Sequence, residues 1–230
     1  MGFDKFLGGL RKIGRQYVLP VQKIQQTIHE VLENISTEMD AGDYLNIIDL
    51  GSGTLFWTEQ IIRNAPTKCR IFAVDLIYNE NFNIDTVISK SAFLKKSDDK
   101  KLICENGEVY LYQSIDDVIL DCDKIDCTFI CDTIHHLNPV IWESMFNVLA
   151  NKSKSIIIKD MDARRQFRNT LNRLHDRIIN GEKIINVYPD KLSRELMKKD
   201  YIVSKIKPVY KLWYPHFIIS AIKNECAFKI

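Results

Sequence analysis

The chain has 230 residues, of which 46% are hydrophobic, 27% charged and 10% aromatic. These values are typical of a folded protein of one domain, and they argue against a disordered, collagen-like or disulfide-stapled chain. The 32 Lys and Arg residues nearly balance the 30 Asp and Glu residues, so the net charge of +2 gives no overall field that would draw the protein onto nucleic acid.

Residues 1–40 are predicted to form a helical lid or cap segment. Residues 1–19 combine apolar residues at helical spacing with basic ones, and they lack the continuous apolar run of a signal peptide. Two interpretations of this segment stay open, a lid helix that packs on its own domain and peripheral contact with a membrane surface. The six cysteines form no C-x-x-C pair and no apolar run approaches the roughly 20 residues of a membrane span. We therefore expect a cytoplasmic protein, with membrane association as the open alternative.

Residues 41–230 are predicted to form one α/β domain, because short apolar runs alternate with helical patterns. The predicted strands are Tyr44–Leu50, Arg70–Asp75, Val109–Gln113, Cys127–Cys131 and Ser155–Lys159. Helices are predicted at Thr58–Asn64 and at Val140–Ala150, the latter with Asn138 as its N-cap, and Ser97–Lys101 is predicted to be a surface loop. Such alternation predicts a mostly parallel sheet with helices on both faces and ligands outside the carboxyl ends of its strands.

The last third of the chain departs from this alternation. A long helix is predicted at Ala163–Asn180, and a short one at Lys191–Lys199 with Asp190 as its cap. Two extended stretches, Tyr201–Val209 and Phe217–Lys223, follow closely enough to pair as a hairpin.

The most informative segment is Ile47–Thr54, in which an apolar strand ends in Asp49 and is followed by Gly51 and Gly53. Glycines allow a sharp turn and let a ligand approach the backbone. Phe56 occupies the third glycine position of the usual dinucleotide fingerprint, which weakens the case for NAD. The second strand ends in Asp75, where a carboxylate can accept hydrogen bonds from both hydroxyls of a ribose.

These segments resemble motifs of the class I S-adenosylmethionine-dependent methyltransferases, in the right order and over roughly residues 44 to 160. The matching strings are Asp49-Leu50-Gly51-Ser52-Gly53, Val74-Asp75 and Asp132-Thr133-Ile134-His135-His136-Leu137. The resemblance implies a Rossmann-like sheet of seven strands with an antiparallel last strand, and S-adenosylmethionine as the cofactor. One departure is Leu55, which stands where the family often has a third glycine.

The resemblance also implies which residues contact the cofactor. It places Asp49 and Asp132 near the methionine part of the cofactor, and it leaves the substrate pocket as an alternative for Asp132. It places Asp75 on the ribose. The remaining implied contact residues are Gly51, Ser52, Gly53, Leu76, Gln113 and Ser114.

An oxygen acceptor needs a base, and histidine suits this role because its unperturbed pKa is about 6.5. The main hypothesis is His175, on a polar strip of the predicted long helix, with Asp160 or Asp162 orienting it or the substrate. His135 follows the fourth strand, where both a contact with the pocket and a packing role are open. The alternative for His175 is a solvated helix face with a structural His–Asp contact.

Four further residues are predicted to bind the substrate together with Asp162. Arg164 and Arg168 lie on the same strip as His175 and are expected to bind an anionic group of the acceptor. Tyr214 and His216 belong to a string, Tyr214-Pro215-His216, that is similar to a bacterial branch of these enzymes acting on small molecules. No metal site is predicted, because neither H-E-x-x-H nor paired cysteines occur.

The sequence therefore predicts O-methylation of a small anionic or amphipathic metabolite, such as a precursor of a surface glycan, lipid or secondary metabolite. A nucleic-acid methyltransferase is one alternative, although Asp132-Thr133-Ile134-His135 stands where many base-modifying enzymes have N-P-P-Y, and no nucleic-acid partner is expected. A cofactor-binding but catalytically idle subunit of a partner enzyme is another. Fold alone does not identify the acceptor.

Overall fold

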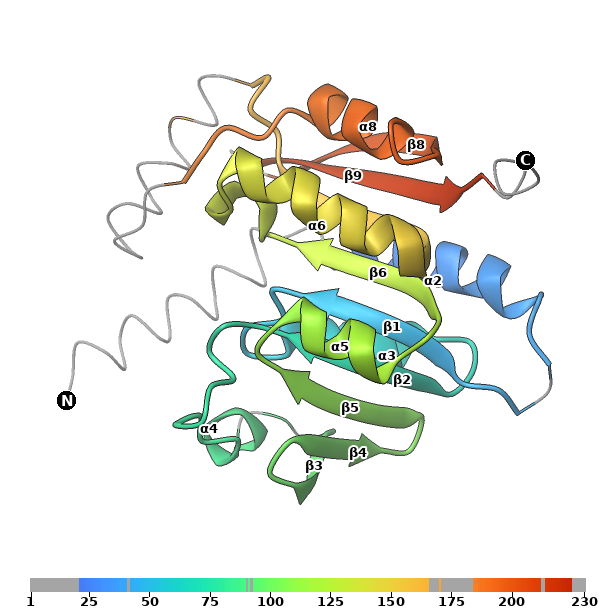
Figure 1. The fold of residues 1–230 in the computed structure, drawn as a ribbon, viewed down its shortest axis with the longest axis vertical. Coiled ribbons are helices and arrows are strands. Elements are labelled where there is room, and N and C mark those ends of the chain that lie inside the picture. The colour runs from blue at the N-terminus through green and yellow to red at the C-terminus, as the bar shows by residue number, and fades with distance from the viewer. Residues whose placement is uncertain are drawn as a thin grey trace.

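The computed structural model describes residues 21–40, 42–89, 91, 93–165, 170, 184–211 and 214–224. These residues form one sheet of nine strands in the order β3-β4-β5-β2-β1-β6-β7-β9-β8 (Figure 1). The strands are β1 Leu45–Leu50, β2 Cys69–Val74, β3 Lys95–Asp98, β4 Lys101–Cys104, β5 Gly107–Tyr112, β6 Ile125–Cys131, β7 Ser153–Met161, β8 Tyr201–Lys211 and β9 Tyr214–Lys223. The helices are α2 Val21–Ser36, α3 Phe56–Asn64, α4 Asp85–Ile88, α5 Ile115–Asp121, the 3₁₀ helix η1 Ile134–His136, α6 Pro139–Lys152 and α8 Pro189–Met197.

The five central strands, β5, β2, β1, β6 and β7, run parallel to one another. The last strand, β9, lies between β7 and β8 and is antiparallel to both. The prediction of a mostly parallel sheet with an antiparallel last strand is therefore confirmed, and the two C-terminal stretches do pair as a hairpin.

The sheet has two strands more than the expected seven. The additional strands, β3 and β4, form an antiparallel hairpin at the edge of the sheet beyond β5. The prediction of a surface loop at Ser97–Lys101 is wrong for this reason. All four residues of β3 are exposed, so backbone pairing with β4 holds this strand and no alternation of apolar residues reveals it.

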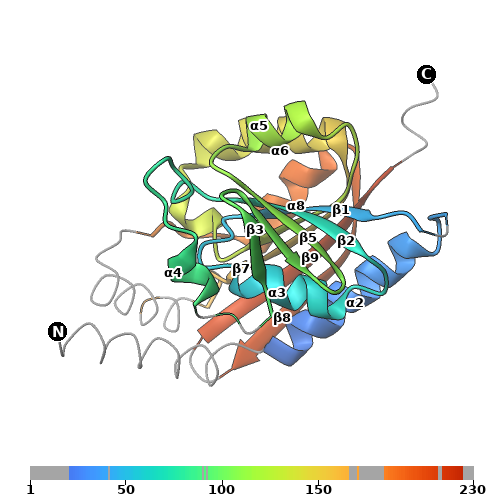
Figure 2. The ribbon, with the colours of Figure 1, turned by 90° about the horizontal axis from the view of Figure 1, so that it is seen from below.

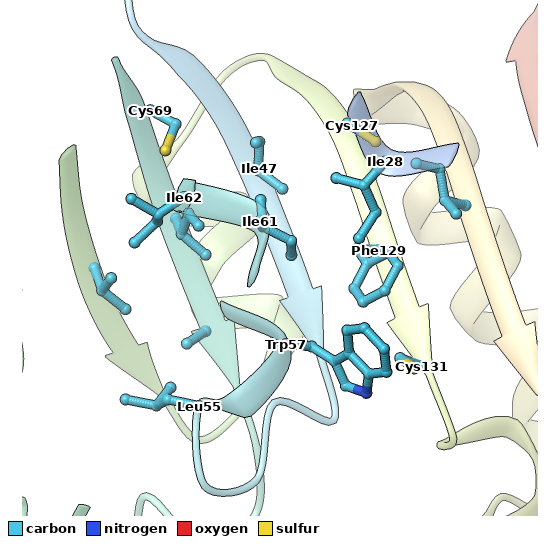
Figure 3. Packing of buried hydrophobic residues seen from close by; sticks show 14 of the residues in the cluster. Ile28, Ile47, Leu55, Trp57, Ile61, Ile62, Cys69, Cys127, Phe129 and Cys131 are labelled. Carbon is cyan, nitrogen blue, oxygen red and sulfur yellow. The ribbon is translucent and has the colours of Figure 1, made fainter. Parts of the chain in front are cut away.

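Helices cover both faces of the sheet, as predicted. Helices α5, α6 and α8 lie on one face, and α2 and α3 lie on the other (Figure 2). Because successive side chains of a strand point to opposite faces, Ile47 packs on the side of α2 and α3, and Ile48 packs on the side of α6. Trp57 of α3 meets Phe129 of β6 edge-on, with ring centroids 5.9 Å apart (Figure 3).

A local sequence signal accounts for the start of α6. The Asn138 side chain accepts a hydrogen bond from the Val140 amide at 3.0 Å and caps α6, with Pro139 in the first turn. Asp190 is not the cap of α8, because that helix begins at Pro189 and Asp190 lies within its first turn.

The predicted helix Ala163–Asn180 lies largely outside the described residues, and so do Arg168, the predicted substrate contact, and His175, the predicted base. Its first residues form a turn, in which the Ala163 amide donates to the Val187 carbonyl at 3.0 Å. Residues 1–19, with their lid and membrane interpretations, also lie outside the described residues. No described helix has the length and apolar character needed to cross a membrane.

Candidate functional site at the carboxyl edge of the sheet

The loop after β1 depends on Gly51, which is packed tightly by a neighbouring loop. Gly51 has φ +76°, and a Cβ atom added there would overlap the Thr133 side chain. The Thr133 hydroxyl donates to the Leu50 carbonyl at 3.1 Å and so ties the loop after β6 to the end of β1. Gly51 is therefore required by the packing of the chain itself, besides any contact with a ligand.

Leu55 stands where the resemblance leads one to expect a third glycine, and it adopts the conformation a glycine would favour. Its φ of 61° lies in the left-handed region, and it occupies the N-cap of α3. The Leu55 side chain is buried in the core on this face of the sheet, which offsets the backbone strain. The departure at Leu55 therefore leaves the turn itself intact.

Gly53 and Asp75 form an open acceptor site beside this turn. The Asp75 carboxylate accepts hydrogen bonds from the Gly53 amide at 2.8 Å and from the Ile77 amide at 3.1 Å. A Cβ atom on Gly53 would meet only an Asp75 oxygen, 3.9 Å away, so the loop is open at this point. Leu76 follows directly and is 77% exposed. A carboxylate beside an open glycine and an exposed apolar side chain suits the ribose and base of a nucleoside.

Tyr78, which the sequence analysis missed, fixes the same loop from the side. Its hydroxyl donates to the Gly53 carbonyl at 2.7 Å and lies 2.9 Å from the Ser52 hydroxyl oxygen. Burial raises the pKa of Tyr78, so its hydroxyl stays neutral at physiological pH. No local pattern marks this residue, because the contact depends on the course of the loop after β2.

Asp49 lies beneath the loop and is almost completely buried. The Thr58 hydroxyl donates to its carboxylate at 2.5 Å. Burial raises the pKa of Asp49 to about 7, an effect that the Thr58 hydrogen bond opposes and the nearby Asp75 charge increases. Asp49 thus binds α3 to the end of β1, and in the structure its carboxyl group faces Thr58.

Gln113 and Ser114 follow β5, next to the end of β2. Gln113 is exposed. The Ser114 hydroxyl accepts a hydrogen bond from the Asp116 amide at 3.1 Å and caps α5. The Ser114 side chain therefore has a structural role in this arrangement, whereas Gln113 is accessible to a ligand.

The ends of β6 and β7 carry a buried ion pair between Asp132 and Lys159. The Lys159 ammonium nitrogen lies 2.5 Å from both carboxylate oxygens of Asp132. The Lys159 side chain is fully buried, whereas the Asp132 side chain is 31% exposed. Burial would raise the pKa of Asp132, but the Lys159 charge and its hydrogen bonds are the main opposing effect, and the pKa is lowered to about 2. Sequence analysis missed Lys159, which sits within a run of apolar strand residues.

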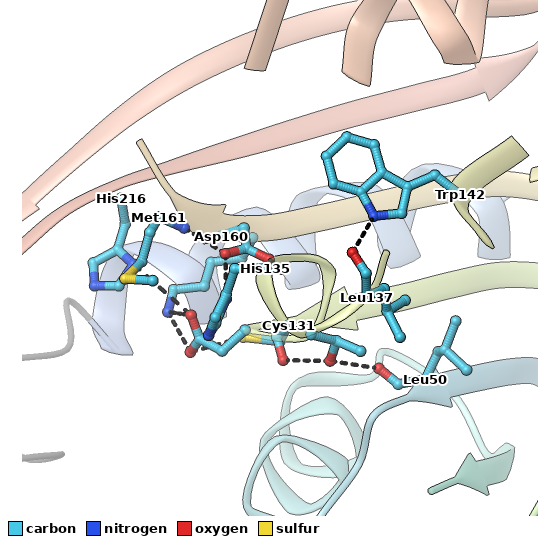
Figure 4. Close-up of polar contacts among 11 residues, drawn as sticks. Leu50, Cys131, His135, Leu137, Trp142, Asp160, Met161 and His216 are labelled. Carbon is cyan, nitrogen blue, oxygen red and sulfur yellow. Dashed lines mark hydrogen bonds and ion pairs between the residues drawn. The ribbon is translucent and has the colours of Figure 1, made fainter. Parts of the chain in front are cut away.

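His135 and Asp160 form a second buried pair at this edge (Figure 4). The His135 Nδ1 atom lies 2.6 Å from an Asp160 carboxylate oxygen, and the His135 amide donates to the other oxygen at 3.3 Å. The loop that carries His135 is anchored by Trp142, whose indole N–H donates to the Leu137 carbonyl at 3.1 Å. Asp160, expected to orient His175, is thus engaged by His135.

His216 comes to the same place from β9, opposite Met161 in the register of β7 and β9. It is buried, and its Nδ1 atom lies 3.8 Å from an Asp132 oxygen. Burial and the Lys159 charge lower the pKa of His216 to about 3, so the ring is neutral at physiological pH. Tyr214 begins β9 close by in sequence.

Arg164 is engaged by two carboxylates. Its guanidinium donates to both oxygens of the buried Asp162, at 2.9 and 2.8 Å, and reaches Asp190 at 3.4 Å. An anionic group of a substrate would have to compete with these partners for the Arg164 charge.

Two cavities lie near the ends of the sheet. One of about 350 Å³ is lined by Tyr78, Leu111, and residues of the loop after β2 and of the β3–β4 hairpin. The other, of about 470 Å³, is lined by residues such as Asn46, Arg70 and Asp126 near the start of the strands, at the opposite edge from the site. Among the described residues, no group of three or more His, Cys, Asp or Glu could hold a metal ion.

Comparison with known proteins identifies the fold. Magnesium protoporphyrin IX methyltransferase from Synechocystis, solved with bound S-adenosylhomocysteine, superposes with a TM-score of 0.58 at 15% identity over 94% of each chain. A methyltransferase dependent on S-adenosylmethionine (SAM) from Aquifex aeolicus gives 0.54 at 14% identity over 96% of this chain and 98% of that one. Human N-acetylserotonin methyltransferase, solved with SAM, gives 0.54 at 14% identity over 89% of this chain and 55% of that one.

The chain thus has the fold of the class I SAM-dependent methyltransferases. No family model matches the sequence, and no curated protein matches it either.

Proposed function

We propose that this protein is a SAM-dependent methyltransferase that methylates an oxygen atom of a small molecule. The observation that carries the proposal is the Asp75 carboxylate bonded to the Gly53 amide at an open glycine turn, in a fold shared with enzymes of this class. The first strand, the glycine turn and the acid after the second strand stand in the order that the resemblance requires.

The residues at the carboxyl edge suit the cofactor. Asp75 would accept the ribose hydroxyls, and Leu76 and Gln113 are exposed beside the place for the base. Gly51, Ser52 and Gly53 would line the turn beneath it, Ser114 would support the base side through its helix cap, and Asp49 and Asp132 would lie toward the methionine end. When bound, SAM supplies a methyl group already activated by a sulfonium, so the protein has to align the acceptor and remove its proton.

His135 and Asp160 are the pair that we assign to proton removal. The carboxylate of Asp160 holds the Nδ1 side of the imidazole, the arrangement that orients a histidine base in hydrolases. His175, outside the described residues, stays a second candidate for the base, with Asp162 near the turn that leads to it.

The acceptor is proposed to be an anionic or amphipathic metabolite, such as a precursor of a surface glycan, a lipid or a secondary metabolite. Arg164, Arg168, Tyr214 and His216 are the proposed substrate contacts. Because Arg164 is already paired with Asp162 and Asp190, its contact with an anionic group of the acceptor would add little to the binding affinity. We further propose that the protein is cytoplasmic, with residues 1–19 as a lid or a membrane contact.

Calorimetry with SAM and S-adenosylhomocysteine tests the cofactor, and methyl release with candidate acceptors tests the catalysis. With a true acceptor, we expect H135Q and D160N to lower kcat by about 10²- to 10⁴-fold while leaving the affinity for SAM nearly unchanged. H29Q alters an exposed histidine of α2, away from this edge of the sheet, and serves as the matched control. Full activity of H135Q with loss of activity in H175Q would transfer the role to His175.

Two other results would change the assignment. Binding of SAM with no transfer to any acceptor, but activation of a partner enzyme, would identify an idle subunit. Binding to RNA or DNA that weakens steeply with salt, together with methyl transfer to it, would identify a nucleic-acid methyltransferase.

A further inference from the structure

Lys159 is a fully buried cation whose ammonium group meets a carboxylate that opens to solvent. Its nitrogen lies 2.5 Å from both oxygens of Asp132, and the exposed fractions of the two side chains are 0% and 31%. Lysine is almost never fully buried unless it is paired. The pair is therefore oriented, with its positive end inside the protein and its negative end at the carboxyl edge of the sheet.

Lys159 also holds the backbone of Asp132. The Asp132 amide donates to the Lys159 carbonyl at 2.9 Å. Asp132 has φ +52°, a left-handed conformation that costs a residue other than glycine about 1 kcal/mol or more. Such a conformation persists only where the surrounding contacts require it, and one residue of β7 supplies contacts to both the main chain and the side chain of Asp132.

The charged and titratable groups around Asp132 and its neighbour Cys131 come from five elements. They are Asp49 of β1, Cys131 of β6, His135 of η1, Lys159 and Asp160 of β7, and His216 of β9. Asp160 is already paired with His135, and His216 is neutral at physiological pH. Lys159 is thus the cation that faces Asp132 most directly, and without it burial alone would favour the protonated carboxyl group.

We propose that Lys159 is a positioning residue, which holds the Asp132 carboxylate at the edge of the sheet so that it receives the cationic part of the cofactor. This inference rests on the proposed function. Stability alone gives little reason for this buried ion pair, since a protein with apolar residues of similar volume in its place is often just as stable. The Asp132 carboxylate is 31% exposed and has lone pairs beyond those that face Lys159, so it can also contact a ligand that carries a sulfonium and an ammonium group.

The test replaces the ammonium by an apolar side chain of similar length, in K159M. At pH 7, we expect SAM to bind roughly 10- to 100-fold more weakly than to the wild type, because the Asp132 carboxyl group loses its tether and burial then favours its protonated form. Between about pH 5 and 7, where the α-amino group of the cofactor stays protonated, the affinity of K159M should rise with pH through the increased pKa of Asp132, whereas that of the wild type should stay nearly constant. S-adenosylhomocysteine has the ammonium group but no sulfonium. A loss of affinity for SAM alone would therefore show that the carboxylate contacts the sulfonium, and an equal loss for both ligands would show that it contacts the ammonium group.

D132N and the double variant D132N/K159M separate this role from a general loss of structure. Both should bind SAM weakly at every pH, and the double variant should be no weaker than D132N, because Lys159 acts through Asp132. K198M removes an exposed lysine that pairs with Glu195 at 3.0 Å and should leave binding unchanged. Additive losses, or a K159M variant that binds SAM like the wild type, would overturn the proposal.

A second measurement needs no ligand. The carbon-13 shift of the Asp132 carboxyl group should show no titration above about pH 4 in the wild type and should titrate at a clearly higher pH in K159M. If the wild type fails to bind SAM, the proposed function fails, and this titration then decides by itself whether Lys159 controls Asp132. An unchanged titration in K159M would contradict that control.

Discussion

Two aspartates at the same edge of the sheet have pKa values that their surroundings shift in opposite directions. Asp49 is buried beside a hydroxyl group, and its pKa is raised to about 7. Asp132 is half-buried beside an ammonium group, and its pKa is lowered to about 2. The half of the edge around β1 and β2 is thus organised by backbone turns and uncharged groups, and the half around β6, β7 and β9 by compensated charges.

The difference shows how one edge can receive a ligand with a neutral nucleoside end and a charged amino-acid end. A glycine turn offers space and amide groups, and the Asp75 carboxylate beside it is held by backbone amides. A buried ion pair offers a fixed charge, but it needs partners from strands that are far apart in the sequence. Each half suits one chemical part of the proposed cofactor.

The largest expected effect is a change in the free energy of unfolding when Asp49 is replaced. A carboxyl group whose pKa is raised in the folded state loses stability as the pH increases from the unfolded value, near 4, to about 7. D49N removes this loss and keeps an acceptor for Thr58. We expect D49N to be more stable than the wild type by up to about 4 kcal/mol at pH 8 and nearly equal at pH 4. Urea unfolding at the two pH values measures this, and a gain independent of pH would contradict the assignment.

The next largest effect is the loss of stability when a side chain is added in the glycine turn. G51A should lower the free energy of unfolding by about 3 kcal/mol, because its Cβ atom would overlap Thr133 and its φ is positive. G42A, at a residue with φ +101° and no atom within 4 Å of the added Cβ, should cost only about 1 kcal/mol. G53A should be about as stable as G42A but should bind SAM more weakly. Equal stabilities of G51A and G42A would show that the Thr133 side chain moves aside and accommodates the added Cβ atom.

The smallest effect concerns Tyr78. Y78F removes the hydroxyl that donates to the Gly53 carbonyl, so we expect a loss of about 1 kcal/mol in stability and a severalfold weaker affinity for SAM. Y188F, at an exposed tyrosine, should change neither quantity and is the matched control. Thermal unfolding and calorimetry measure both effects, and an unchanged affinity in Y78F would limit this hydroxyl to a structural role.

The first half of the edge was predictable from the sequence, and most of the second was not. Gly51, Gly53 and Asp75 lie within one stretch, and each signals its role through local backbone chemistry. The pairing of Lys159 with Asp132 and the approach of His216 depend on which strands become neighbours, which no local pattern encodes. His135 and Asp160 were each expected as candidates, but their pairing appeared only once β7 was placed beside η1. The β3 strand escaped for another reason, because all of its side chains are exposed.

The position of β9 has a consequence for how the protein is made. Since β9 lies between β7 and β8, a nascent chain that has emerged only as far as β8 has no partner strand to dock against β7. Until β9 leaves the ribosome, that flank of β7 has open backbone groups, and His216 has yet to reach the side of Asp132. The charged half of the site is therefore completed last during synthesis, well after the glycine turn has the residues it needs to form.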